Sequence, residues 1–366
     1  MALSAKIDPA VTSPEGVGMV FKKKGNTYLE LLTTPNLHLY PIRDFDIYGM
    51  YETCQNMLWT MKELNMTDDL PDIIDKLTPD ERYYVLGVLL FFKTSDLQVL
   101  ENCLVKMWEM IKLPEARLFY SLQSYFEAVH SETYSMLFDV YVRCVRNNNL
   151  EVSNITKDDL SDMISGREID TFKSIEDKQT WCARYMEDCN AMEDLPRLLL
   201  AFACVEGIFF SGAFAAIFHL KKRNLLRNLC KANEFISRDE GQHQRFGCML
   251  YNKLKGEGLG LSPEDELKMV QDAVDIEKKF VCECLPVALI GCNKELMQDH
   301  IEFMGDFLLQ WIGRDAHYFK ECPFPEFSQI CLERKTNFFE ETVSEYQQGL
   351  SEDVELTLDV FSECDV

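Results

Sequence analysis

The sequence predicts an all-α protein built as one large helical domain. The chain has 366 residues, of which 47% are hydrophobic, enough for one large core. It contains only 17 glycines and 12 prolines, so long helices are favoured over frequent turns. Apolar residues recur at helical spacing from about Tyr40 onward, and little of the chain alternates as a strand would. We expect a loosely ordered arm over 1–35, a helical domain over 36–349 and a mobile acidic tail over 350–366.

The helices can be placed in order from their apolar spacing and their end signals. The first is expected from 44 to 64. The second begins after Thr78, a good N-cap, with Pro79 at the first helical position and acids in the first turn, and runs to about 110. A third covers 114–146, and a polar segment over 147–162 then breaks the pattern. Further helices are expected at 190–220, 224–254, 263–288, 294–313 and 337–348.

One segment, 198–220, is almost wholly apolar and long enough to cross a bilayer. Glu206 lies near its middle, where a carboxylate would be costly in hydrocarbon. A helix that is apolar on all sides can equally be the central helix of a large bundle. We therefore expect a core helix and no membrane contact.

The net charge and the cysteine content make several partners and classes of protein poor candidates. The formal net charge is -24, which repels phosphate and makes nucleic acid and anionic membranes poor partners. The 14 cysteines show no CxxC pairs of a zinc site, and no secretory signal is recognisable at the N-terminus. We expect reduced thiols in a cytoplasmic protein.

Acidic residues and Glu-x-x-His motifs recur in a set order along the predicted helices. Two single acids lie within apolar helical segments, and each is followed at similar spacing by a Glu-x-x-His motif. The order is Asp96, Glu127-Ala-Val-His130, Glu206 and Glu240-Gly-Gln-His243. Because Glu and His at i and i+3 share one helix face, both motifs can point into one bundle.

This set of four carboxylates and two imidazoles predicts a dimetal site in a ferritin-like helical bundle elaborated with additional helices. Carboxylate oxygens suit hard divalent ions, and imidazole suits iron or manganese. A single Glu-x-x-His motif would more often be a solvated helix face, so the prediction depends on the complete set. Tyr134 lies about one turn after His130 on the same face. Spacing alone leaves open whether it is a core tyrosine or a phenol beside the metals.

Five segments of the chain resemble the small subunit of eukaryotic-type class I ribonucleotide reductase. They are 79–84 (PDERYY), 128–134 (AVHSETY), 206–214 (EGIFFSGAF), 236–243 (ISRDEGQH) and 335–340 (KTNFFE). The resemblance covers about residues 40 to 350. It implies an oxidoreductase subunit whose di-iron centre activates O2 to generate a stable tyrosyl radical, which a large subunit uses to reduce ribonucleotides to deoxyribonucleotides.

The resemblance also assigns roles to single residues. Tyr134 matches the radical tyrosine, and Phe210, Phe214 and Ile236 match its apolar pocket. Two iron ions per chain, or manganese in the same donors, would be held by Asp96, Glu127, His130, Glu206, Glu240 and His243, with Glu127 and Glu240 at the bridging positions.

The family's radical route implies further residues and partners. Trp59, Asp239 and His130 match its buried part, and Tyr346 matches the tail tyrosine at the subunit interface. The resemblance implies a homodimer that docks on the large subunit through the C-terminal tail. The tail has the family's Thr-Leu-Asp core but runs about four residues longer than usual.

Two alternatives remain open at this point. One is another dimetal oxidase or oxygenase on the same scaffold, which would have no reason to keep Tyr134, Trp59, Asp239 and Tyr346 together. The other is a non-catalytic protein, either an iron store or a regulatory paralogue. The complete ligand set and the tyrosine argue against a regulatory paralogue.

Overall fold

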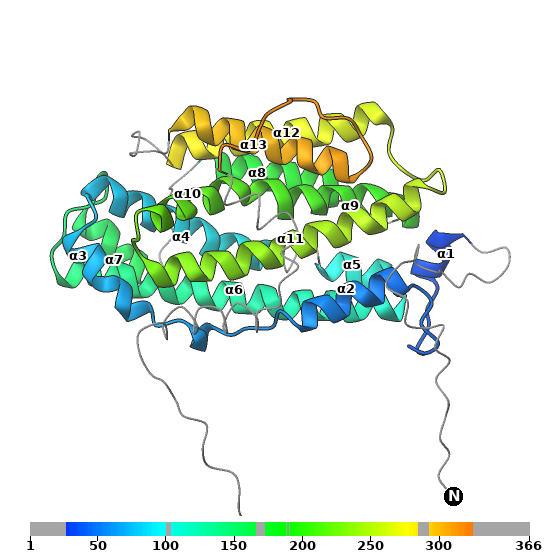
Figure 1. Cartoon of the computed structure of the whole chain (residues 1–366), viewed down its shortest axis with the longest axis horizontal. Helices are drawn as coiled ribbons and strands as arrows, with labels where there is room; N and C mark the ends of the chain where they lie inside the picture. Colours follow the sequence, from blue (N-terminus) through cyan, green and yellow to red (C-terminus); the bar gives the residue numbers. More distant parts are fainter. Residues whose placement is uncertain are drawn as a thin grey trace, which may run out of the picture.

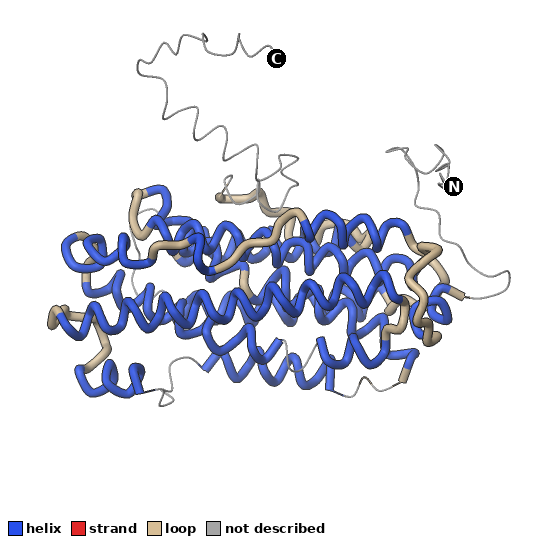
Figure 2. The backbone as a smooth tube through the Cα atoms, turned by 90° about the horizontal axis from the view of Figure 1, so that it is seen from below, coloured by secondary structure: helices blue, strands red, loops and turns tan. Residues whose placement is uncertain are grey.

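The structure is a computed structural model that describes residues 27–99, 104–165, 173–187, 189, 191–284 and 293–324. At positions 94–99 it describes the backbone and not the side chains. Within these ranges the elements are helical and no β-strand is present, as the tube view in Figure 2 shows. The predicted all-α class is confirmed.

The centre of the molecule is a set of long helices that run along its longest axis (Figure 1). They are α4 (Pro79–Val99), α6 (Pro114–Asn147), α11 (Arg227–Lys255) and a continuous helical run made of α9 (Leu195–Cys204), the π-helical segment η7 (Val205–Phe209) and α10 (Ser211–Lys222). Helix α6 packs against α4 and α11, and α11 packs against α9 and α10. These helices therefore surround one common interior.

Further helices cover this centre. Helices α12 (Pro263–Cys284) and α13 (Lys294–Trp311) pack on each other, and α12 also packs on α8 (Lys173–Cys182), forming the upper layer of Figure 1. Helix α2 (Phe45–Gln55) packs on α6. The shorter elements are α1 (Tyr28–Thr33), η2 (Met61–Glu63), η3 (Met66–Asp69), α3 (Leu70–Asp75), α5 (Val105–Met110), α7 (Lys157–Ser165), η5 (Ala183–Glu187) and η6 (Met192–Asp194).

The helix starts follow from side-chain capping. At α4 the Thr78 amide donates to Glu81 Oε2 at 2.9 Å, and the Glu81 amide donates to Thr78 Oγ1 at 3.2 Å. This reciprocal capping box satisfies two amides that the first helical turn leaves without partners. The start predicted from Thr78 and Pro79 is therefore confirmed.

Several predicted helix bounds were wrong. The helix expected over 44–64 ends at Gln55. The one expected to reach 110 is described as α4 up to Val99 and as α5 from Val105 to Met110, and 100–103 lie outside the described residues. Helix α7 begins inside the segment taken as a polar break, where Thr156 and Asp159 cap each other's amides, and it continues to Ser165. Helix α1 lies within the residues expected to form an arm. The helix expected at 337–348 lies outside the described residues.

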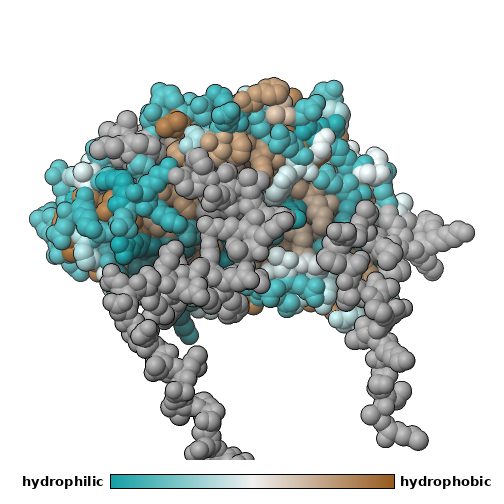
Figure 3. Space-filling view, in the orientation of Figure 1, coloured by the Kyte–Doolittle hydropathy of each residue, from teal (hydrophilic) through white to brown (hydrophobic). Residues whose placement is uncertain are grey.

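The apolar segment around Glu206 lies at the centre of the fold. Helix Met192–Lys222 is long and apolar enough to cross a membrane by length and composition, but its apolar window is 100% buried inside the structure. On the face shown in Figure 3, hydrophilic side chains cover much of the described surface, interrupted by smaller apolar areas. Burial on this scale is expected of a helix enclosed by other helices.

Candidate metal centre

A cluster of acids and one histidine lies in the interior between α6, η7 and α11. Glu127, Glu206, Glu240 and His243 each offer one ligand atom, and these atoms all lie within 4.8 Å of one another. All four side chains are buried. The sequence predicted each of them, although they come from three different elements.

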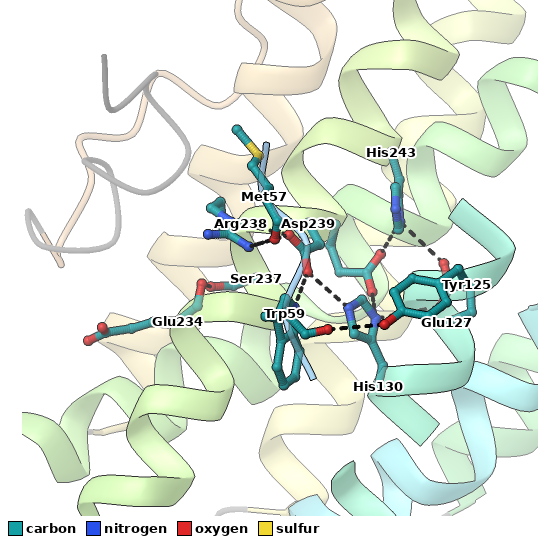
Figure 4. Close-up of polar contacts among 11 residues, drawn as sticks. Met57, Trp59, Tyr125, Glu127, His130, Glu234, Ser237, Arg238, Asp239 and His243 are labelled. Atoms are coloured by element: carbon teal, nitrogen blue, oxygen red, sulfur yellow. Dashed lines mark hydrogen bonds and ion pairs between the residues drawn. The ribbon is translucent and has the colours of Figure 1, made fainter. Parts of the chain in front are cut away.

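The two imidazoles face the same pair of glutamates. His130 Nδ1 lies 2.9 Å from Glu240 Oε1 and 3.7 Å from Glu127 Oε2. His243 Nδ1 lies 2.9 Å from Glu240 Oε2 and 3.2 Å from Glu127 Oε1. Figure 4 shows His130 and His243 close to Glu127. Glu127 and Glu240 therefore lie between the two histidines, where a bridging carboxylate would have to be.

Glu206 reaches the cluster from η7, and its position depends on a contact that the sequence analysis missed. Gln123 Nε2 donates a hydrogen bond of 2.9 Å to Glu206 Oε1. Gln123 is buried and lies one turn before Glu127 on α6. That spacing was a signal that could have placed Gln123 on the same face as the predicted ligands.

The sixth predicted ligand, Asp96, lies on α4 at a position whose side chain is outside the described residues. Helix α4 packs along α6, which carries Glu127 and His130. The structure thus brings five of the six predicted ligands together and describes only the helix that carries the sixth.

The electrostatics of the cluster fit bound cations. Burial would lower the pKa of His130, but Asp239, Glu127 and Glu240 raise it well above its usual value. Burial would likewise lower the pKa of His243, but Glu240 and Glu127 raise it to about 9. Burial raises the pKa of Glu240, and the two histidines nevertheless hold it well below its usual range. The carboxylates therefore make this buried interior favourable for positive charge.

The hydrogen bonding of these atoms also fits metal ligation. Although close to carboxylates, His130 Nδ1 and Glu127 Oε1 make no hydrogen bond of acceptable geometry among the described residues. Buried acids are costly unless they are paired or bind metal. Carboxylate and imidazole donors around one buried space suit divalent iron or manganese. The residues present therefore fit a dimetal centre.

Tyr134 lies on α6 one turn beyond His130 and is fully buried. The ring of Phe92 stacks on it, with centroids 4.2 Å apart and planes 2° from parallel. Phe92 in turn contacts Phe214 and Phe210, at 5.2 and 6.1 Å between centroids. Phe210 and Phe214 thus belong to the same aromatic group as Tyr134, while Phe92 itself was missed by the sequence analysis. Phe92 lies one turn before Asp96, a spacing that could have indicated it.

Ile236, the third residue predicted for the tyrosine pocket, is buried on α11. No contact between Ile236 and Tyr134 is described. It lies on the helix that carries Glu240 and His243, and its role in the pocket stays a prediction.

A hydrogen-bonded line leads away from the centre through Asp239. Trp59 Nε1 donates to Asp239 Oδ2 at 2.7 Å, and His130 Nε2 lies 3.3 Å from the same oxygen. Arg238 donates to the other oxygen, Oδ1, at 2.9 and 3.1 Å, and also to Met57 O at 2.8 Å. Figure 4 shows these contacts together. The structure therefore connects the predicted residues Trp59, Asp239 and His130, whereas Tyr346 lies outside the described residues.

Long helices around a buried cluster of carboxylates and imidazoles define a ferritin-like protein whose core could hold a dimetal centre. The chain belongs to the ribonucleotide reductase small-chain family, whose model, described as "Ribonucleotide reductase, small chain", matches residues 36–323. The fold class and the family expected from the sequence are both confirmed.

Individual relatives agree over most of the chain. The ribonucleoside-diphosphate reductase small chain of Trypanosoma brucei brucei is 40% identical over 344 residues, which is 93% of this chain and 96% of that protein. The ribonucleotide reductase Rnr4 homodimer from Saccharomyces cerevisiae is similar in structure, with a TM-score of 0.69 and 26% identity, over 87% of this chain and 92% of that one. The ribonucleotide reductase R2 subunit from Clostridium botulinum, at 20% identity and a TM-score of 0.69 over 86% of this chain and 98% of that one, shares the fold.

Proposed function

We propose that this chain is the radical-generating small subunit of a ribonucleoside-diphosphate reductase. The observation that carries the proposal is the placement of Tyr134, which is buried one turn from His130, next to a cluster of carboxylates and imidazoles. From the same histidine a hydrogen-bonded line leads outward to Trp59. Another dimetal oxidase would need the cluster but not this line.

The metal ligands in this proposal all lie on the central helices. They are Asp96, Glu127, His130, Glu206, Glu240 and His243. Two iron ions bound there would supply the oxidising power for Tyr134 by activating O2, and the donor types suit manganese as well. The chain itself orients the ligands, with Gln123 holding Glu206 and Asp239 holding His130.

In this proposal the pocket of Tyr134 protects a radical because its described walls are aromatic and apolar. The ring of Phe92 covers one face of the phenol, and Phe210 and Phe214 continue the apolar group. Ile236 is assigned to the same pocket. An apolar site without water keeps reductants and proton donors away from an oxidised tyrosine. A subunit that forms its radical before it binds the large subunit needs a radical that persists until binding.

Asp239 links the metal centre to the buried Trp59 in this proposal. Its Oδ2 holds the Nε1 proton of Trp59 and faces His130 Nε2, so it can keep both rings in register during electron transfer. Tyr346 and the tail over 350–366 would carry the transfer on to a large subunit. The homodimer and the cytoplasmic location expected from the sequence belong to the same proposal.

The test is nucleotide reduction by the assembled enzyme. We expect the iron-loaded chain, mixed with its large subunit, to convert ribonucleoside diphosphates to deoxyribonucleoside diphosphates. A chain that ends at residue 349 should keep its iron and its radical but lose the activity, because it cannot dock. An iron store would bind many ions per chain rather than two. A chain that forms the radical, binds the large subunit and yields no deoxyribonucleotide would contradict the proposal.

A further inference from the structure

The helical run that carries Glu206 is interrupted beside the metal cluster. The π-helical segment η7 ends at Phe209 and α10 begins at Ser211. Where a π-helical register returns to an α-helical one, some backbone groups lose their partners in the helix. At this junction the Phe209 carbonyl and the Gly212 amide bond to side chains of other helices.

These two side chains are Lys178 of α8 and Glu277 of α12. Lys178 Nζ donates to Phe209 O at 2.7 Å, and the Gly212 amide donates to Glu277 Oε1 at 3.0 Å. Lys178 Nζ also lies 2.6 Å from Glu277 Oε2. The ammonium and the carboxylate thus bind each other and both ends of the interruption.

The ion pair of Lys178 and Glu277 is buried in the core. Lys178 is 6% exposed and Glu277 0%. The Lys178 ammonium lies over the rings of Phe280 and Phe91, at 3.8 and 4.1 Å from their centroids. A Cβ added at Gly212 would lie 2.6 Å from Glu277 Oε1, so glycine permits the close approach of the carboxylate.

A buried ion pair is poor support for stability, because apolar residues of similar volume often serve as well or better. Such pairs are better explained where they fix one arrangement of the chain. Here the arrangement concerns a short segment that places Glu206 in the metal cluster and begins the helix of Phe214. Burial raises the pKa of Glu277 to about 7 in spite of Lys178, so the pair is best studied at about pH 8.

We propose that Lys178 and Glu277 are a positioning pair that holds the π-helical segment, and through it the Glu206 carboxylate, in the place that the dimetal centre requires. The proposal rests on the proposed function, since it concerns the same centre. Neither side chain is a metal ligand, and neither touches Tyr134 in a described contact. Their effect on the centre is transmitted by the backbone between Glu206 and Gly212.

The experiment compares three variants with the wild-type full-length chain at about pH 8. The double variant Lys178→Met/Glu277→Met replaces the pair by apolar side chains of similar length. Glu277→Gln keeps an acceptor for the Gly212 amide. Glu266→Gln is the matched control, because Glu266 is equally buried on the same helix and binds Tyr251, Lys255 and Arg314 instead.

Cobalt(II) is the metal probe, because its absorption spectrum reports the geometry of its ligands. Binding is measured without oxygen, and hydrogen exchange of the amides over 205–212 is measured on metal-free protein. We expect the double variant, which removes the side-chain hydrogen-bond partners of the Phe209 carbonyl and the Gly212 amide, to melt below the wild type, to bind cobalt about 10-fold to 100-fold more weakly with an altered spectrum, and to exchange these amides faster. Glu277→Gln should show a smaller loss. Glu266→Gln should lose stability and keep the wild-type affinity.

Two results separate the pair from the centre itself. If the wild type binds two cobalt ions and the double variant matches it in affinity, spectrum and exchange, the positioning role is overturned while the proposed function stands. If the wild type binds none, the proposed function fails and this proposal fails with it. If the double variant does not fold, Glu277→Gln becomes the test of the positioning role. Unchanged cobalt affinity and unchanged amide exchange over 205–212 in that variant would overturn the proposal.

Discussion

Asp239 uses its two carboxylate oxygens for different partners. Oδ1 accepts two hydrogen bonds from Arg238, while Oδ2 accepts the Trp59 indole proton and faces His130. Because Arg238 also binds the Met57 carbonyl, the carboxylate is fixed in one orientation. A single residue thereby sets the relative position of the tryptophan and the histidine.

The substitution Asp239→Asn tests whether both carboxylate oxygens are needed for these separate contacts. The amide keeps the volume, but its nitrogen cannot accept, so either the Arg238 contacts or the shared contacts of Trp59 and His130 are lost. We expect the radical at Tyr134 to form normally and nucleotide reduction per radical to fall by about 10-fold to 100-fold. Radical content from paramagnetic resonance and turnover with the large subunit measure the two separately. Unchanged turnover per radical would contradict the account.

At the scale of the element, boundaries set by neighbouring residues can be predicted from the sequence, whereas boundaries set by distant contacts cannot. The start of α4 was predictable because Thr78, Pro79 and Glu81 are adjacent in sequence. The same kind of signal at Thr156 and Asp159 was present and overlooked. The π-helical segment η7 was not predictable, since the groups that stabilise its end come from α8 and α12.

Helix α13 carries a buried histidine that makes the fold sensitive to acid. Burial lowers the pKa of His300 from 6.5 to about 3, and a backbone hydrogen bond at Ser211 acts weakly in the opposite direction. The folded chain therefore keeps His300 neutral while the unfolded chain takes up a proton below about pH 6.5. Stability from this residue is present above pH 6.5 and is lost progressively as the pH falls toward 3.

His300→Gln isolates the effect, because glutamine is polar and does not titrate. In the wild type, His300 should lower the free energy of unfolding by about 1.4 kcal/mol for each pH unit below 6.5. This amounts to roughly 2 kcal/mol between pH 6.5 and 5. We expect urea unfolding of the wild type to lose that much more stability than the variant over this range. Identical pH dependence in the two chains would show that His300 is not the group responsible.

At the scale of the whole molecule, the metal cluster ties together helices that are far apart in sequence. Glu127, Glu206 and Glu240 come from three elements and meet in the core. Glu127 and Glu240 were predictable because each begins a local Glu-x-x-His motif, and Glu206 because it is a single acid within an apolar helical segment. Gln123 and Phe92 were missed because their importance depends on a partner in another helix, Glu206 or Tyr134.

Metal removal should therefore destabilise the entire domain. A ligand that binds only the folded chain stabilises it by about 2.7 kcal/mol when its free concentration is 100 times the Kd. We expect the melting temperature to fall on treatment with a chelator and to recover on adding ferrous iron without oxygen. Glu240→Ala should melt at the same temperature with and without metal. A wild-type chain with two bound metals and no change in melting temperature would contradict this coupling.

The most direct measurement is low-temperature electron paramagnetic resonance after ferrous iron and O2 are added to metal-free protein. The wild type is compared with Tyr134→Phe and with Tyr120→Phe, which removes another buried tyrosine of α6. The account predicts a tyrosyl signal in the wild type and in Tyr120→Phe and none in Tyr134→Phe. A signal that persists without Tyr134, or no signal in a wild type that has bound and oxidised two irons, would contradict the assignment of Tyr134 as the radical residue.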